Sequence, residues 1–107
     1  MLVNFPFTDL SQTKLRPAII LWIDPVGKDV VVCAVTSQKT NQLEAGEFLL
    51  SATDSDFLHT GLRITSKVKS TRLATLDRKL VMRKLGDLSH AQSAQLDAQL
   101  KQAFQLN

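Results

Sequence analysis

Cysteine is almost absent from this sequence. The 107 residues contain one cysteine, Cys33, in the middle of an apolar stretch. A single cysteine cannot form an intramolecular disulfide, and it cannot supply the set of thiolates that holds a structural zinc ion. We therefore expect Cys33 to be a buried structural thiol.

Long hydrophobic runs are also missing. No apolar segment approaches the roughly 20 residues that a membrane-spanning helix needs, and the N-terminus lacks the basic region of a signal peptide. The sequence has no repeat and no proline- or serine-rich segment, while 44% of its residues are hydrophobic, which is typical of globular proteins. Without a membrane span or a signal peptide, the protein is expected to be cytoplasmic. We expect a single domain over residues 1–107, because a chain of this length has no room for a second one.

Several common catalytic motifs are missing as well. The sequence has no cluster of histidine, cysteine and acidic residues with metal-ligand spacing, no glycine-rich phosphate loop and no nucleophile elbow. Neither a metal nor a cofactor is therefore indicated. His59 falls in a polar loop, and His90 falls in the first turn of an expected helix, where a charged imidazole would oppose the helix dipole. Neither histidine is a good candidate for a general acid or base.

Two apolar runs, at 18–23 and 30–35, form the centre of the sequence. Both are rich in β-branched residues and a turn signal at 24–27 separates them, so they are predicted to be adjacent buried strands. Arg16 begins the first strand, and the pair Thr36-Ser37 ends the second. If the strands pair antiparallel, these side chains lie at the same edge of the sheet. A cation beside two hydroxyl groups is suited to binding a phosphate.

The other strands are predicted from shorter patterns. Residues 2–5 are expected to end a first strand, a polar loop is expected at 8–15, and residues 47–50 are expected to form a short strand. Turn-forming residues dominate 51–61, which predicts a loop or a short helical turn.

Basic residues are concentrated between Arg63 and Lys84, where eight of the thirteen lysines and arginines stand against one acid, Asp77. Residues 62–69 alternate apolar and polar, which is typical of a half-buried strand. Arg63, Lys67 and Lys69 are then expected on the face away from the core. Such a run can simply be a solvated surface, but the excess of one sign favours a surface that follows phosphates.

A helix is predicted near the C-terminus. Ser89 and Gln92 have the spacing of a capping box. Apolar residues follow at helical spacing, namely Leu96, Leu100, Ala103 and Phe104. We expect this helix to pack its apolar face against the sheet.

Short blocks in a fixed order give the sequence a resemblance to a known family. The blocks are Phe5-Pro6-Phe7-Thr8-Asp9, Lys14-Leu15-Arg16-Pro17-Ala18, Thr36-Ser37-Gln38, Gly61-Leu62, Ser66-Lys67-Val68, Leu73-Ala74-Thr75-Leu76-Asp77 and Leu85-Gly86-Asp87-Leu88-Ser89. Over nearly its whole length the chain resembles the MazF/PemK family, the toxin components of bacterial type II toxin–antitoxin pairs.

The resemblance implies a mainly β fold, a small SH3-like antiparallel barrel of the PemK/CcdB type with a C-terminal helix. It also implies a homodimer that cleaves single-stranded mRNA at selected sequences without a metal, with the 2′-hydroxyl of the RNA as the nucleophile. The expected partner is a small antitoxin whose flexible tail occupies the RNA groove.

The same resemblance assigns roles to individual residues. Arg16 is expected to hold the phosphate, because its planar guanidinium can bind two oxygens and stays charged. Thr36 matches the catalytic threonine of the family, and Thr36 and Ser37 are expected to position the phosphate or the 2′-hydroxyl. The other expected RNA contacts are Thr8, Lys14, Gln38, Lys39, Lys67, Lys69 and Arg72.

The sequence departs from the family pattern in two places. Members usually begin several residues earlier, with a Gly-Asp pair that leads into the first strand, so either the start is truncated or this member has a shortened first strand, and an unpaired neighbouring strand would then present an open edge. Several members also carry an acid where this chain has Thr71, and its absence is expected to change the cleavage rate or the base preference.

Two other functions are compatible with these patterns. The first is a member of the family that binds nucleic acid or antitoxin but does not cut. The second is a gyrase-inhibiting toxin of the CcdB type, which shares the barrel but acts through a hydrophobic C-terminal tripeptide. The final residues here, Gln105-Leu106-Asn107, count against the second.

Overall fold

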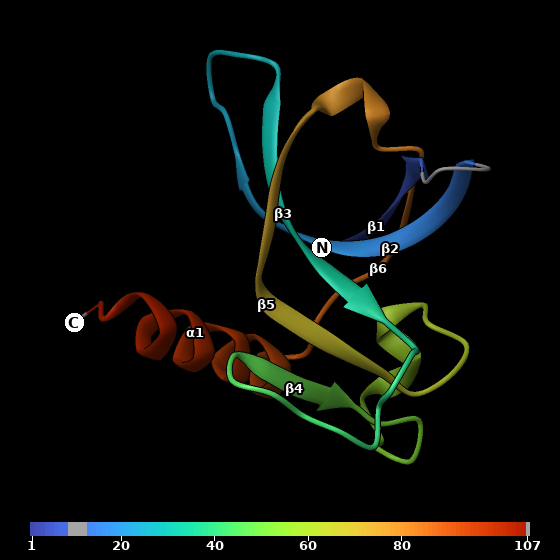
Figure 1. Cartoon of the computed structure of the whole chain (residues 1–107). Coiled ribbons are helices and arrows are strands. Elements are labelled where there is room, and N and C mark those ends of the chain that lie inside the picture. The colour runs from blue at the N-terminus through green and yellow to red at the C-terminus, as the bar shows by residue number, and fades with distance from the viewer. Residues whose placement is uncertain (9–12, 107) are drawn as a thin grey trace.

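The computed structural model describes residues 1–8 and 13–106. Six strands, two short 3-10 helices and one α-helix lie within those residues (Figure 1). In chain order they are β1 (Leu2–Thr8), β2 (Thr13–Ile23), β3 (Asp29–Thr36), β4 (Glu47–Leu50), η1 (Phe57–Thr60), β5 (Ser66–Asp77), η2 (Arg78–Leu80), β6 (Arg83–Gly86) and α1 (His90–Phe104).

The strands form one antiparallel sheet in the order β4-β5-β3-β2-β1-β6. The predicted mainly β, antiparallel fold with a C-terminal helix is confirmed. The sheet is strongly bent, as Figure 1 shows, but it is not closed into a barrel. Closure would need a ladder between β4 and β6, and in the described part of the chain these two strands form opposite edges of the sheet.

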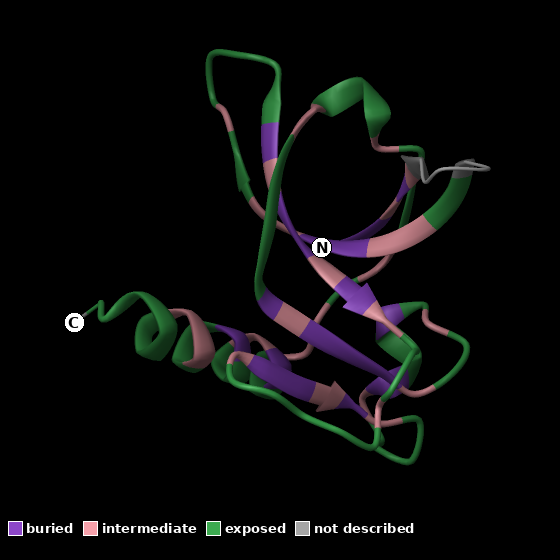
Figure 2. Cartoon of the chain, viewed as in Figure 1, coloured by how far each residue is buried: buried purple, intermediate pink, exposed green. Residues whose placement is uncertain are grey.

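The predicted hairpin of β2 and β3 is confirmed, with Ala18 opposite Ala34 and Ile19 opposite Cys33. Successive residues of β3 point to opposite faces of the sheet. Most of β3 is buried or partly buried (Figure 2). Cys33 and Val35 belong to one apolar cluster, with Leu2, Ile19, Phe48, Leu50, Phe57, Val68 and Leu96. Val30 and Val32 belong to a second cluster, with Phe5 and Ala18. A strand buried on both faces needs an unbroken apolar run, which is the pattern of residues 30–35.

The first strand is longer than expected. β1 reaches Thr8 and pairs with β2 on one side and with β6 on the other, so β1 is not itself an edge strand. The predicted loop at 8–15 is correspondingly wrong at both ends, because Thr8 belongs to β1 and Thr13–Leu15 to β2. Residues 9–12 lie outside the described residues.

The strand predicted at 62–69 starts later and continues further. β5 begins at Ser66, so Arg63 precedes it and does not share its face, and Arg63 and Ile64 are both exposed. The pairing of β5 with β3 shifts between Lys69 and Leu73, and β5 bends midway along its length (Figure 1). The first part of β5 lies between β4 and β3, and beyond the irregularity β5 pairs with β3 alone.

The predicted helix is present, with the predicted capping box. Ser89 Oγ accepts from the Gln92 N–H at 3.0 Å, and Gln92 Oε1 accepts from the Ser89 N–H at 2.8 Å. Leu96 packs in the core, but Phe104 is 49% exposed, because the last turn of α1 runs past the edge of the sheet (Figure 1). Among the described residues no helix is long and apolar enough to cross a membrane.

Gly61 and Gly86 lie where the backbone of η1 and the residue after it packs directly against the backbone of β6. A Cβ on Gly61 would collide with the carbonyl of Leu85, and a Cβ on Gly86 would collide with the carbonyl of His59. Gly61 also has a φ of 75°, in the left-handed region. The Asp87 N–H donates to the same His59 carbonyl at 2.8 Å, so η1 and β6 are held together without side chains between them.

Candidate nucleic-acid interface

A groove of about 680 Å³ crosses β1, β2, β3 and β5. Its lining combines basic, hydroxyl and apolar side chains. These residues are Phe5, Pro6, Arg16, Pro17, Val32, Ala34, Val35, Thr36, Lys69, Arg72, Leu73, Ala74 and Leu76.

The strand register explains why these residues meet. Ala18 on β2 is opposite Ala34 on β3, and continuing that register by two residues brings Arg16 level with Thr36. Ala34 is in turn opposite Lys69 on β5. Residues directly opposite one another share a face of the sheet, so Arg16, Thr36 and Lys69 lie on one surface. The predicted proximity of Arg16 and Thr36 is therefore present.

The charged side chains that line the groove are all basic. Arg16, Lys69 and Arg72 line it, and no acidic residue does so within the described part of the chain. Arg16 and Lys69 are half-buried, and water screens charges less in such positions than on an open surface. The groove is therefore suited to an anion that also has flat apolar parts, which describes a nucleic-acid strand.

The hydroxyl of Thr36 is fixed by the turn that follows β3. Thr36 Oγ1 accepts a hydrogen bond from the Gln38 N–H at 3.1 Å. A hydroxyl has one proton to donate as well as lone pairs to accept, so this bond uses an acceptor position and leaves the proton for a ligand in the groove.

The other predicted contacts lie around the groove or away from it. Ser37, Gln38 and Lys39 are exposed in the turn after β3, and Lys14 is exposed on β2. Within the described residues none of these four lines the groove. The side chain of Thr8 lies outside the described part of the structure.

Lys67 is not the exposed basic residue that its strand pattern predicted. It is 5% exposed, and its ammonium lies 2.8 Å from Glu47 Oε1 and donates to the Gln42 carbonyl at 2.9 Å. The alternation of apolar and polar residues did predict the correct face of β5, because Lys67 lies opposite Thr36, which lines the groove. The segment 39–46 covers that face at Lys67, which the local pattern cannot reveal.

Glu47 remains charged in this buried pair. Burial by itself raises the pKa of a carboxyl, but the Glu44 N–H, which donates to Glu47 Oε1 at 2.9 Å, and the Lys67 ammonium outweigh it. The net effect lowers the pKa of Glu47 below its ordinary value of 4.5.

Position 71, where the family resemblance led us to expect an acid, faces a different hollow. Thr71 lines a depression of about 570 Å³ together with Glu44, Glu47, Gln99 and Gln102. In this chain, a carboxylate at position 71 would lie beside that depression rather than in the groove.

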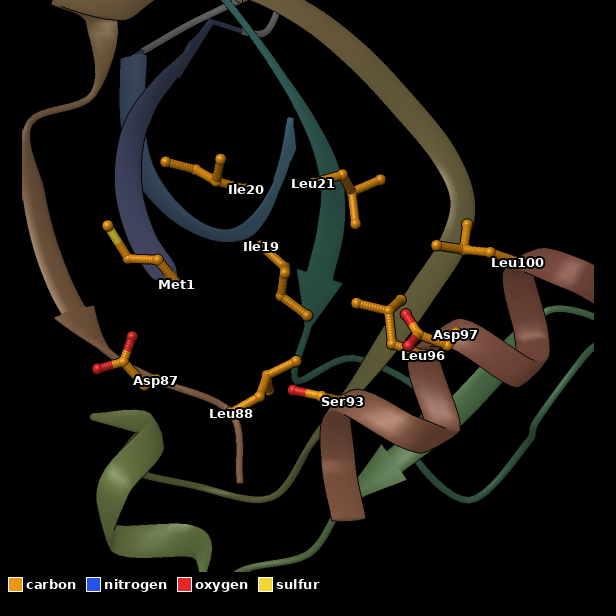
Figure 3. Close-up of a pocket in the computed structure, with 10 residues that line it drawn as sticks. All are labelled: Met1, Ile19, Ile20, Leu21, Asp87, Leu88, Ser93, Leu96, Asp97 and Leu100. Carbon is orange, nitrogen blue, oxygen red and sulfur yellow. The ribbon is translucent and has the colours of Figure 1, made fainter. Parts of the chain in front are cut away.

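A further hollow of about 410 Å³ lies between β2 and α1 (Figure 3). Ile19 and Leu21 from β2 and Leu96 and Leu100 from α1 form its apolar walls. Asp87, also in its lining, forms an ion pair with Lys84 at 2.9 Å, and that hydrogen bond lowers the pKa of Asp87. None of the predicted site residues that the structure describes lines this hollow.

Cys33 and the two histidines lie away from the groove. Cys33 is a buried free thiol, as predicted, and burial raises its pKa to about 11. His59 and His90 are exposed. Within residues 1–8 and 13–106, no three side chains of histidine, cysteine, aspartate or glutamate gather closely enough to hold a metal ion.

The sequence patterns did not predict the apolar part of the groove. Phe5, Pro6 and Pro17 form one wall because Phe5 is opposite Arg16 in the ladder of β1 and β2. The Phe-Pro-Phe block is the available signal, but its place beside Arg16 depends on the pairing of β1 with β2.

Comparisons with known proteins agree with this architecture. The PemK-like, MazF-like toxin family of type II toxin–antitoxin systems matches residues 1–104. No curated protein matches the sequence.

Solved structures share the fold at low sequence identity. The Mycobacterium tuberculosis toxin MazF-mt6 is 24% identical, with a TM-score of 0.75 over 100% of this chain and 99% of the toxin. An endoribonuclease in complex with its cognate antitoxin, from a mycobacterial species, is 18% identical, with a TM-score of 0.71 over 98% of this chain and 93% of that one. A MazE–MazF structure from Deinococcus radiodurans is 21% identical, with a TM-score of 0.68 over 99% of this chain and 94% of that one.

Proposed function

Because the chain belongs to the PemK-like, MazF-like toxin family of type II toxin–antitoxin systems, we propose that it is a metal-independent, sequence-selective endoribonuclease that cuts single-stranded RNA. The observation that carries this proposal is the groove. Arg16, Lys69 and Arg72 converge there with the hydroxyl of Thr36, and within the described residues no carboxylate opposes them.

The proposed reaction uses a nucleophile that the RNA itself carries. The 2′-oxygen bonds to the adjacent phosphorus, and the bond from phosphorus to the 5′-oxygen of the next nucleotide breaks. The 2′-hydroxyl loses a proton and the leaving 5′-oxygen gains one, which gives a 2′,3′-cyclic phosphate and a free 5′-hydroxyl. No metal is needed to generate the nucleophile, so the protein has to orient the 2′-oxygen and stabilise charge on the phosphate.

The groove residues can meet both requirements. Arg16 would hold two phosphate oxygens and stabilise the charge that builds on them in the transition state. Thr36 would donate its proton to the phosphate or to the 2′-oxygen, and Ser37 would contact the neighbouring ribose. Lys69 and Arg72 would bind adjacent phosphates, and Pro17 and Leu73 would give the bases an apolar surface.

The polar residues around the groove would extend the RNA contacts. Lys14, Gln38 and Lys39 are exposed and could bind phosphates or bases beyond the cut, and Thr8 is assigned the same role on the family resemblance alone.

The proposed partners follow from the family. We propose a cytoplasmic homodimer whose cognate antitoxin places an acidic, flexible tail in the cationic groove, where it competes with RNA. One of the similar solved structures is an endoribonuclease in complex with its cognate antitoxin, and another is a MazE–MazF structure, which supports a protein partner of this kind.

One substitution in the substrate tests the proposed function. An RNA oligonucleotide that the protein cuts is compared with the same oligonucleotide carrying deoxyribose on the 5′ side of the cut. Cleavage should be abolished while binding stays nearly intact, because most contacts are expected to be with phosphates and bases. Product analysis should find a 2′,3′-cyclic phosphate, formed equally well with EDTA present.

The other outcomes separate the alternatives. If the deoxy oligonucleotide is cut, or if cleavage requires a divalent metal, the 2′-hydroxyl is not the nucleophile and the roles of Arg16 and Thr36 are wrong. If RNA is bound in the groove but never cut, the chain is a binding module of the same family.

A further inference from the structure

Three charged side chains lie on one face of the sheet beside the groove, but they have different surroundings. Lys67 and Lys69 are two residues apart on β5, and Glu47 is on the neighbouring strand β4. Lys67 and Glu47 form an ion pair at 2.8 Å with side chains only 6% and 5% exposed. Lys69 is half-buried and lines the groove.

The ladder would also allow the other pairing. Glu47 is directly opposite Lys69, whereas Leu49 is opposite Lys67, so Lys67 reaches Glu47 along a diagonal. Directly opposite side chains in an antiparallel ladder have Cβ atoms about 5 Å apart, so Lys69 can reach Glu47 at least as easily as Lys67 can. Within the described part of the chain, however, Lys67 alone forms the ion pair with Glu47.

Two backbone groups of segment 39–46 fix this choice. The Gln42 carbonyl accepts a hydrogen bond from Lys67 Nζ at 2.9 Å, and the Glu44 N–H donates to Glu47 Oε1 at 2.9 Å. The segment thus covers Lys67 and leaves Lys69 uncovered beside Thr36 and Arg72 in the groove.

We propose that Lys67 is a positioning residue: by neutralising Glu47 it leaves the Lys69 ammonium in the groove, where Lys69 binds a phosphate of the substrate. The proposal rests on the proposed function in that it takes the ligand to be an RNA strand. Without Lys67, the buried carboxylate of Glu47 needs another cation, because an unpaired buried charge is strongly unfavourable. Lys69 lies directly opposite, so Lys69 turns to Glu47 and leaves the groove.

The test measures how RNA binding depends on salt. The probe is a short single-stranded RNA of mixed sequence with 2′-O-methyl riboses throughout, which cannot react through a 2′-hydroxyl. For single strands, log affinity against log salt loses about 0.7 units of slope for each phosphate contact that is lost. Log affinity should therefore fall less steeply with log salt for Lys67→Met than for wild type, by about 0.7 units of slope.

A second substitution separates this role from direct contact and from simple destabilisation. The double variant Lys67→Met with Glu47→Gln removes the carboxylate that attracts Lys69, so the wild-type slope should return. With a cleavable RNA, Lys67→Met should raise KM with kcat near its wild-type value, and the double variant should restore KM. If Lys67 bound phosphate itself, the double variant would keep the reduced slope of the single one. If the pair were only structural, Lys67→Met would weaken the fold but keep the wild-type slope, because no phosphate contact would be lost.

The variant Lys69→Met gives the matched comparison. In the wild-type background, Lys69→Met should make the slope shallower by about 0.7. In the Lys67→Met background, Lys69→Met should not change the slope further. Equal losses in both backgrounds would overturn the proposal, because Lys69 would then still bind phosphate without Lys67.

The proposal stays testable if Lys67→Met does not fold. Glu47→Gln alone keeps an oxygen that can accept from Lys67 and from the Glu44 N–H, and it should leave the slope unchanged. A steeper slope in this variant would show that Glu47 already holds Lys69 in the wild-type protein, and the proposal would be wrong. These slopes require no cleavage, so a protein that never cuts RNA would refute the proposed endoribonuclease activity without deciding the role of Lys67.

Discussion

Arg16 combines charge, partial burial and a fixed place in the ladder. It is half-buried, lies opposite Phe5 on β1, and comes level with Thr36 when the register of β2 and β3 is continued. A guanidinium held in a groove of this kind is preorganised toward a phosphate and needs little rearrangement during the reaction. Lys14, two residues earlier on the same strand, is exposed and outside the groove lining. Position in the sheet, rather than charge alone, therefore distinguishes the two residues.

Replacing Arg16 with alanine should lower kcat by about 10²–10³, the range found when one electrostatic donor to a transition state is removed. Steady-state cleavage of an RNA oligonucleotide measures the effect, and circular dichroism should report an unchanged fold. Arg83→Ala removes an exposed arginine from β6 outside the groove lining and serves as the matched control, with near-normal kcat expected. Cleavage by Arg16→Ala at the wild-type rate would refute the role.

At the scale of elements, α1 is attached to the sheet mainly through its beginning. Ser89 caps the helix, and its hydroxyl also donates to Asp56 Oδ2 at 2.6 Å, just before η1. Leu96 is buried in the core, but the turn that carries Phe104 is exposed. The N-terminal half of α1 should therefore contribute more to stability than the C-terminal half.

Replacing Ser89 with alanine should lower the free energy of unfolding by about 1–2 kcal/mol, because it removes the cap and the hydrogen bond to Asp56 together. Urea unfolding followed by circular dichroism measures the change. Ser93→Ala, in the next turn of the helix, keeps the backbone hydrogen bond from the Ser93 N–H to the Ser89 carbonyl and should change the free energy by less than about 0.5 kcal/mol. Equal losses in the two variants would show that the cap is not what stabilises α1.

At the scale of the whole molecule, the buried pair of Glu47 and Lys67 joins parts that are distant in sequence. It links β4 to β5 and, through Gln42 and Glu44, holds the segment after β3 against the sheet. The same segment is fastened further along, where the Gly46 carbonyl accepts from both the N–H and the hydroxyl of Ser70.

This pair should make the fold sensitive to acid. The pKa of Glu47 is lower in the folded state than its ordinary value of 4.5, so the unfolded chain takes up this proton first as the pH falls. The stabilisation from Glu47 is complete above pH 4.5 and is lost progressively below it. We expect the thermal unfolding midpoint to fall with pH in that range, and to fall less steeply in Glu47→Gln.

The comparison is between slopes rather than between absolute midpoints, because Glu47→Gln also leaves Lys67 without its counter-ion. Glu44→Gln, which changes an exposed acid in the same segment, is the control and should keep the wild-type dependence. Parallel curves for wild type and Glu47→Gln would show that another carboxyl group is responsible for the acid sensitivity.

Several features of this protein depend on local signals, and the sequence alone was enough to predict them. The hairpin of β2 and β3, the cap at Ser89 and the burial of Cys33 follow from apolar period, turn residues and capping spacing within short windows. The sequence also placed Arg16 at the same end of the hairpin as Thr36 and Ser37, but the register shift between Ile20 and Trp22 decides that Thr36 is the residue level with it.

The tertiary structure decided the features that depend on which distant segments meet. Lys67 and Lys69 lie on the same face of β5. Segment 39–46 covers Lys67 and keeps it from solvent, whereas Lys69 lines the groove. The bend in β5 and the open sheet likewise depend on how β5 pairs with β4 and β3 in its first part and with β3 alone in its second. A period of two fixes the face of a strand on which a side chain lies, but only the packing of the rest of the chain determines whether that face is covered.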